Sequence, residues 1–211
     1  MHSGFHAQRN GDAVDPCEAE QAVKKYALAI DALGTVEPNS SDATSAVATI
    51  ARIQPQAIVM YASYKASAEF VRGMRAAQSY AQFMNLSIVG ATALAKELGN
   101  EVRGIGVSQI VPFPWNIGVP IVKEYQTVMK AETGKSECSF LTLESYLSAR
   151  ILVEGLRRAG RDLTREKLIP ALETMHDVNF GGFRVSFSRT NHEASKFVEL
   201  TVIGKDGQIL R

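Results

Sequence analysis

Residues 55–64 read Pro55-Gln-Ala-Ile-Val-Met-Tyr-Ala-Ser-Tyr64, and this stretch decides the fold. It contains a continuous apolar run at 57–61, followed by a helical pattern with Phe70 and Met74 on one face. Unbroken apolar strands are typical of parallel sheets that helices cover on both faces. Ligands of such open sheets bind beyond the carboxyl ends of the strands. The stretch therefore predicts a buried strand at 57–61 whose end, from Tyr61 to Tyr64, lies at the edge of a site.

Composition excludes several classes of protein. The chain has 211 residues, of which 45% are hydrophobic, and this is enough for one large domain or two small lobes. Its formal net charge of +1 gives no electrostatic case for binding nucleic acid or an anionic membrane. No run approaches the roughly 20 apolar residues of a membrane span. The N-terminal stretch, Met1 to Gly11, has no apolar core of the kind that marks a signal peptide.

Strand and helix patterns alternate through the first half of the chain. After a polar lead-in we expect helices at 17–33, 43–51, 65–80 and 92–98, and strands at 35–37, 57–61, 86–89 and 104–111. This alternation is the signature of a doubly wound sheet. After Pro120 helices dominate, at 121–133, 140–159 and 164–175, and strand signals return at 182–187 and 197–202. We therefore expect a lobe boundary at 112–120.

The candidate catalytic and metal-binding motifs in the sequence are all incomplete. His192-Glu193 lacks the second histidine of a zinc helix, and Gly104-Ile-Gly106 lacks a third glycine and a following helix. Cys17 and Cys138 stand at no motif spacing, and we interpret both as unpaired small hydrophobic residues. The sequence predicts no catalytic residue, no metal site and no cofactor, so it favours a binding protein over an enzyme.

Several short motifs follow one another in a recognisable order. They include Pro55-Gln-Ala-Ile-Val-Met60, Phe70-Val-Arg-Gly-Met-Arg-Ala-Ala77, Gly104-Ile-Gly-Val-Ser-Gln-Ile-Val-Pro112, Leu152-Val-Glu-Gly-Leu-Arg-Arg-Ala-Gly160 and Gly181-Gly-Phe-Arg-Val-Ser-Phe-Ser188. In this order, across residues 17–211, the chain resembles the type I periplasmic solute-binding proteins of ABC importers. Within that family the resemblance is to the receptors for branched-chain amino acids (leucine, isoleucine and valine).

The resemblance implies an α/β fold with a doubly wound parallel sheet lobe and a partial second lobe. We expect residues 1–16 to be a poorly ordered lead-in. Residues 17–110 and 190–211 would form the carboxyl-terminal lobe, and 111–189 would supply a hinge strand and helices to the first lobe. The βα units with which the family's first lobe begins, and the secretion signal before them, have no counterpart in this sequence. The chain is therefore expected to correspond to the carboxyl-terminal portion of such a receptor.

The resemblance also implies a function. We expect a periplasmic receptor of an ABC importer, which binds an amino-acid-like or carboxylate solute between two lobes and delivers it to an ABC permease. Micromolar affinity corresponds to about 8 kcal/mol, which both lobes share, so a partial first lobe should weaken binding by this chain alone. An apolar lobe surface without its sheet would favour a homodimer.

Ligand contacts are expected from two places in the chain, the loop after the strand at 57–61 and the start of the long helix. These residues are Tyr61, Ser63, Tyr64, Phe140, Glu144 and Ser145. Glu144 would pair with a ligand ammonium group, while Tyr64 or Phe140 would pack on an apolar side chain. The alternatives are a core position for Tyr61 and a helix-dipole role for Glu144. Trp115 and Phe113 are more typical of hinge packing than of ligand stacking.

The loop after the strand departs from the family pattern. Receptors for branched-chain amino acids carry an acidic residue there that meets the ligand amine, whereas this chain reads Ser63-Tyr-Lys-Ala-Ser67. Lys65 would instead favour an acidic solute. Two other functions stay open: a ligand-sensing regulatory domain on the same fold, and a nucleotide-binding α/β enzyme. The second would require a glycine-rich turn after the first strand, which the sequence lacks.

Overall fold

The computed structural model describes residues 3–8, 16–37, 39–134 and 137–211, and for residues 3–8 and 16–18 it describes the backbone alone. Contacts divide the chain into two compact units. The first comprises residues 1–108 and 200–211, and the second comprises residues 109–199. The sequence analysis placed the corresponding boundaries after residues 110 and 189. The chain passes between the units at the ends of two strands, which lie at 106–109 and 199–203.

The first unit is built on a seven-stranded sheet with the order β2-β1-β3-β4-β5-β8-β9. Its strands are β1 (Ser3–Gln8), β2 (Ile30–Val36), β3 (Ala57–Tyr61), β4 (Gln82–Asn85), β5 (Gly106–Gln109), β8 (Glu199–Ile203) and β9 (Ile209–Leu210). The pairs β1–β2, β1–β3, β3–β4 and β4–β5 are parallel, and the C-terminal β8–β9 pair is antiparallel. This order confirms the predicted doubly wound α/β fold.

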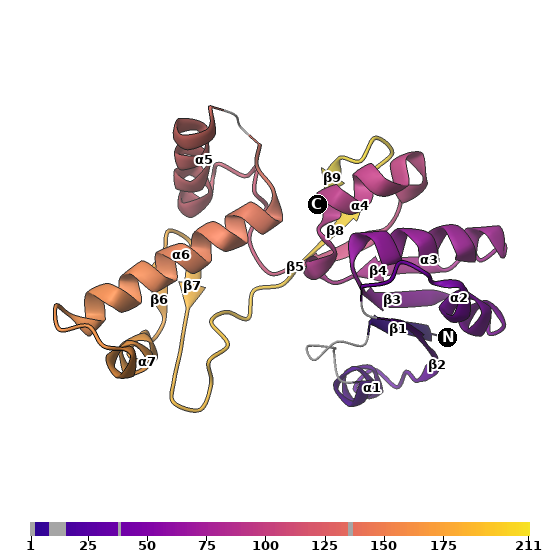
Figure 1. The fold of residues 1–211 in the computed structure, drawn as a ribbon, viewed down its shortest axis with the longest axis horizontal. Helices are drawn as coiled ribbons and strands as arrows, with labels where there is room; N and C mark the ends of the chain where they lie inside the picture. Colours follow the sequence, from indigo (N-terminus) through magenta and orange to yellow (C-terminus); the bar gives the residue numbers. More distant parts are fainter. Residues whose placement is uncertain (1–2, 9–15, 38, 135–136) are drawn as a thin grey trace. The chain divides into compact units, whose positions relative to one another are not determined.

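Four helices connect the parallel strands: α1 (Pro16–Lys24), α2 (Thr44–Ala51), α3 (Tyr64–Ala76) and α4 (Ala91–Leu98). The strand order reverses between β1 and β3, and because crossovers are right-handed, α1 lies on the opposite face from α2, α3 and α4. Figure 1 shows α3 above β3 and β4, and α1 below β1. The reversal places the carboxyl ends of β1 and β3 side by side, which is where open sheets bind ligands.

The core of the first unit lies between the sheet and helices α2 to α4. Ile58 and Met60 of β3 are fully buried there, and they pack with Phe70 and Met74 of α3 and with Leu94 of α4. The strand predicted at 57–61 is therefore confirmed as the centre of the core. Burial alternates along β3, so that Ala57, Val59 and Tyr61 are half-buried on its other face.

Three expectations for the first unit are wrong. Residues 3–8 of the expected lead-in form β1, which lies between β2 and β3 in the sheet, while residues 1–2 and 9–15 lie outside the described residues. The helix expected at 17–33 ends at Lys24, and the chain then enters β2. Residues 87–89 form a short 3-10 helix rather than a strand, because Gly90 follows with a positive φ of 69° that turns the chain into α4.

The second unit is mainly helical. It contains α5 (Pro120–Thr133), α6 (Phe140–Ala159) and α7 (Arg165–Glu173), followed by an antiparallel hairpin of β6 (Val178–Phe180) and β7 (Phe183–Val185). The predicted bounds of the long helix, 140–159, are confirmed. Gly155 lies where α6 meets α7, and a Cβ there would lie 2.6 Å from Cδ2 of Leu172. Helices α6 and α7 therefore pack so closely at Gly155 that a larger side chain would clash, and this contact fixes the position of α6 in the unit.

Candidate functional site

The loop after β3 carries three of the predicted ligand residues. Tyr61 is the last residue of β3, Ser63 is the N-cap of α3, and Tyr64 is the first residue of that helix. The Ser63 hydroxyl accepts a hydrogen bond from the Ala66 backbone N–H at 3.4 Å, as N-cap serines commonly do. The structure thus brings these three residues together at the carboxyl end of β3.

Exposure distinguishes the three side chains. Tyr61 is half-buried and shares the face of Val59, so it does not belong to the core between β3 and α3. Tyr64 is half-buried and packs against that core. Ser63 and Lys65 are exposed. The loop therefore offers one anchored aromatic ring, a hydroxyl group and a cation to the space beyond the strand.

A buried hydrogen-bonded pair, Ser67 and Asn85, stabilises this loop. Asn85, the last residue of β4, is 1% exposed, and its Oδ1 accepts a hydrogen bond from the buried Ser67 hydroxyl at 3.3 Å. The same hydroxyl lies 3.5 Å from the backbone oxygen of Ala62 in the loop. These contacts connect the carboxyl end of β4 to the turn that presents Ser63 and Tyr64.

The start of α6 carries the other three predicted residues, and a capping box holds it. The Ser139 hydroxyl accepts from the Thr142 backbone N–H at 3.2 Å, and the Thr142 hydroxyl accepts from the Ser139 backbone N–H at 3.1 Å. Such reciprocal bonds satisfy two donors at a helix start. They fix the first turn of the helix that carries Phe140, Glu144 and Ser145.

Phe140 is buried in an aromatic cluster of the second unit. Its ring centroid lies 6.0 Å from that of Phe113 and 5.9 Å from that of Trp115, and both pairs are edge-to-face. The Phe113 and Trp115 centroids are 5.0 Å apart. Such packing is favourable in its own right. The cluster gives Phe140 a structural role in this unit and leaves little of its ring, 8% of the residue, open to a solute.

Glu144 faces a cavity of about 270 Å³ in the second unit. The cavity is lined by Ile110, Val111, Leu147, Ser148, Ile151, Phe183 and residues 193–195 as well as by Glu144. Burial raises the pKa of the Glu144 carboxyl group. Glu144 lies beyond the first turn of α6, whose first residue is Phe140, so the helix dipole acts on it only weakly. A partly desolvated carboxylate in this cavity, whose lining is mainly apolar but also includes Glu193, favours a cationic partner.

Ser145 does not share that cavity. It is exposed, and its hydroxyl donates to the Leu141 backbone oxygen at 3.0 Å within α6. Sequence reasoning missed Leu147 and Ile151, although their helical spacing from Glu144 was a usable signal. It also missed Glu193 and Ser195, which come from a segment without periodicity and carry no signal of their own.

Groups typical of catalysis or metal binding do not assemble in the described part of the chain. No three histidine, cysteine or acidic side chains there come close enough to hold a metal ion. Cys138 is free, and the side chain of Cys17 lies outside the described residues. The described helices also include none with the length and apolar character that a membrane crossing needs.

Comparison with known proteins identifies the family. The family model described as periplasmic binding protein matches residues 11–208. The chain belongs to the periplasmic binding protein family. No curated protein matches the sequence of this chain significantly.

Solved structures of the periplasmic binding protein family show how much of the fold is shared. A substrate-binding periplasmic protein from Ralstonia solanacearum is 30% identical, with a TM-score of 0.88, over 99% of this chain and 60% of its own. A possible leucine/isoleucine/valine-binding protein from Rhodopirellula baltica SH 1 is 27% identical, with a TM-score of 0.89, over 99% and 58%. An extracellular ligand-binding receptor from Verminephrobacter eiseniae is 26% identical, with a TM-score of 0.80, over 100% and 61%. The chain thus spans about three-fifths of the length of each of these relatives.

Proposed function

We propose that this chain is part of a periplasmic solute receptor of an ABC importer and that it binds an amino-acid-like solute. The observation that supports this proposal most directly is the position of the loop from Tyr61 to Tyr64. This loop lies at the carboxyl end of β3, beside the reversal of the strand order. Ligands of open α/β sheets bind at this point. The family membership supports the same conclusion, and the named relatives include a substrate-binding periplasmic protein.

Glu144 is the proposed partner of the solute's ammonium group. Its carboxylate accepts no hydrogen bond or ion pair among the residues that the structure describes, and burial raises its pKa. An ammonium group would replace the water that burial removes, and charge-assisted hydrogen bonds are worth roughly 1.5–3 kcal/mol. The apolar lining from Leu147, Ile151 and Phe183 suits the side chain of an apolar amino acid.

The first unit would contribute hydroxyl groups and an aromatic surface. Ser63 and Tyr61 are proposed to hydrogen-bond the solute, and Tyr64 to pack on it. Phe140 would act through the aromatic cluster, and Ser145 would contact the solute only if its hydroxyl left the Leu141 carbonyl. The exposed Lys65 favours an acidic solute instead.

Titration calorimetry on the chain tests this proposal. Leucine represents an apolar amino acid, glutamate an acidic one, and NAD a nucleotide. We expect leucine to bind and Glu144→Gln to weaken its binding roughly 10- to 100-fold. The matched control is Glu132→Gln, which removes an exposed carboxylate from α5 of the same unit and should leave binding unchanged. Heat from NAD with none from amino acids would reject the receptor proposal.

The partners of the complete receptor follow from the same proposal. A receptor of this family acts in the periplasm and hands its solute to an ABC permease. The apolar side chains that α6 exposes, Leu141, Leu152 and Val153, would support a homodimer of this chain.

A further inference from the structure

The first unit has a hollow at the edge of its sheet opposite the Tyr61–Tyr64 loop. Its lining comes from the end of α3, the turn at 77–81, the start of β4 and the turn before β5, and its volume is about 430 Å³. The residues are Arg75, Gln78, Ser79, Tyr80, Ala81, Gln82, Phe83, Arg103, Gly104 and Ile105. These positions are at the amino ends of β4 and β5, whereas the Tyr61–Tyr64 loop follows the carboxyl end of β3. The hollow is therefore separate from the proposed solute site.

The hollow is positively charged. Arg75 and Arg103 line it, and no acidic side chain of the described residues does. Within the described residues neither arginine forms an ion pair. Arg72, one turn earlier on α3, differs sharply, because it lies within 4 Å of the carboxylates of Glu69, Glu97 and Glu101. Two uncompensated guanidinium groups in one hollow favour an anion, since each can donate two parallel hydrogen bonds to a carboxylate or phosphate.

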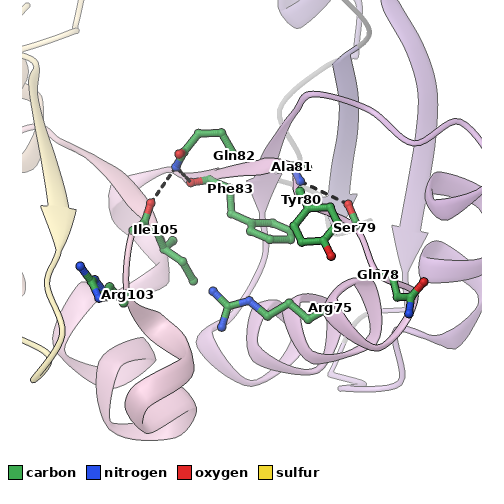
Figure 2. A pocket seen from close by; sticks show the side chains of 10 residues that line it. Arg75, Gln78, Ser79, Tyr80, Ala81, Gln82, Phe83, Arg103 and Ile105 are labelled. Atoms are coloured by element: carbon green, nitrogen blue, oxygen red, sulfur yellow. Dashed lines mark hydrogen bonds between the residues drawn. The ribbon is translucent and has the colours of Figure 1, made fainter.

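The floor of the hollow is apolar and fixed in place. Phe83 is 5% exposed and Ile105 is 1% exposed. The Gln82 side-chain amide donates to the Phe83 backbone oxygen at 3.0 Å and to the Gly104 backbone oxygen at 2.7 Å, which ties β4 to the turn before β5. Figure 2 shows the side chains of Arg75, Phe83 and Ile105 converging on the hollow from these elements. The cations thus stand beside a preformed apolar surface.

Tyr80 adds an unusual feature to the rim. Its side chain is 97% exposed, although tyrosine normally buries most of its ring. The ring stands in the turn between α3 and β4, on the side of the hollow where Arg75 lies. An exposed ring near a guanidinium group can stack on a flat apolar group once a ligand enters.

We propose that this hollow binds a small organic anion that joins a flat apolar body to a phosphate or carboxylate group. The anionic group lies between Arg75 and Arg103, and the apolar body lies against Phe83, Ile105 and the Tyr80 ring. The site is independent of the solute site at the carboxyl edge, so it offers the receptor a second ligand that does not compete with the transported solute.

Titration of the ¹⁵N-labelled chain with phenyl phosphate tests the proposal by NMR. Phenyl phosphate should shift the backbone amide signals of Gln82 and Gly104 and leave that of Ser63 in place. It should bind about 10-fold more tightly than inorganic phosphate, because only phenyl phosphate reaches the apolar floor. No movement of the Gln82 and Gly104 signals would overturn the proposal, as would equal binding of the two phosphates.

Variants separate a site from general attraction between charges. Arg75→Gln and Arg103→Gln should each weaken phenyl phosphate binding about 10-fold, and Arg75→Lys should weaken it less, because it keeps the charge but loses the planar fork. Arg52→Gln is the matched control, since it removes an exposed arginine from the same unit outside the hollow. Equal weakening by Arg52→Gln would show that only net charge matters and would reject the site. Unchanged signals elsewhere in each variant's spectrum verify folding.

Discussion

The hydroxyl group of Tyr125 lies 2.5 Å from Oγ1 of Thr142, and this contact joins α5 to the first turn of α6. The Ser139 backbone N–H donates to the same hydroxyl at 3.2 Å. Burial raises the pKa of Tyr125, so the hydroxyl keeps its proton at neutral pH. The helix that carries Glu144 is therefore held at its start by a partly buried polar cluster as well as by its own capping box.

Tyr125→Phe should destabilise the second unit by about 1–2 kcal/mol, because it removes the hydroxyl group that bonds to Thr142 and Ser139. Trp115 is the only tryptophan and lies in this unit, so its fluorescence follows the unit during urea unfolding. We expect the midpoint to fall by roughly 0.5–1 M. Tyr26→Phe, at an exposed site of the first unit, should leave the midpoint unchanged. An unaltered midpoint in Tyr125→Phe would show that the contact is energetically neutral.

Much of the fold could be predicted from local patterns. The strand at 57–61 and the helix at 140–159 have the bounds expected from an apolar run and from a helical stripe that ends at Gly160. The pattern at 17–33 misled, because small and apolar residues in β2 also satisfy helical spacing, and the register with β1 selects the strand. β1 itself has no apolar run, and only its pairing with β2 and β3 defines it.

The site was less predictable than the fold. Placing Tyr61, Ser63 and Tyr64 at a strand end needed only the order of the elements. Phe140 is different, because its burial depends on Phe113 and Trp115, some 25 residues away in sequence. The cavity at Glu144 likewise depends on residues 193–195, and the hollow at Arg75 depends on Arg103. Local periodicity carries no information about such distant contacts.

Gly73 should not tolerate a methyl group. A Cβ at this position would lie 2.6 Å from Cγ2 of Val47, where α2 packs on α3, and the β-branched valine cannot easily turn away. Overpacking costs about 1–3 kcal/mol and should exceed the roughly 1 kcal/mol that alanine contributes to helix propensity. Thermal unfolding of Gly73→Ala, Val47→Ala and the double variant would measure the coupling. The double variant should be destabilised by less than the sum of the two single destabilisations. A loss of stability equal to that sum would contradict close packing between Gly73 and Val47.

The exposed apolar side chains of α6 should promote self-association. Leu152 and Val153 are 46% and 42% exposed on this helix. We expect the weight-average mass in sedimentation equilibrium to rise with protein concentration, and the double variant Leu152→Gln/Val153→Gln to reduce the rise. Ile88→Gln, which changes an exposed apolar side chain of the first unit, is the control and should leave the rise in mass unaltered. Concentration-independent monomer mass for the unmodified chain would exclude the homodimer.

The raised pKa of Glu144 makes opposite predictions for stability and for solute binding. Because the folded chain holds this proton more tightly than the unfolded chain, the group favours folding below its unfolded pKa, and that contribution is lost as pH rises through the folded pKa. At pH 7, Glu144→Gln should therefore unfold at the same temperature as the unmodified chain or at a higher one, and the difference should vanish near pH 4. Leucine affinity should instead fall as pH drops through the folded pKa, because the ammonium group requires the ionised carboxylate. Thermal unfolding and calorimetric titration across this range separate the two effects. A variant that loses stability at pH 7 while keeping leucine affinity would give Glu144 a structural role and move the ammonium site elsewhere.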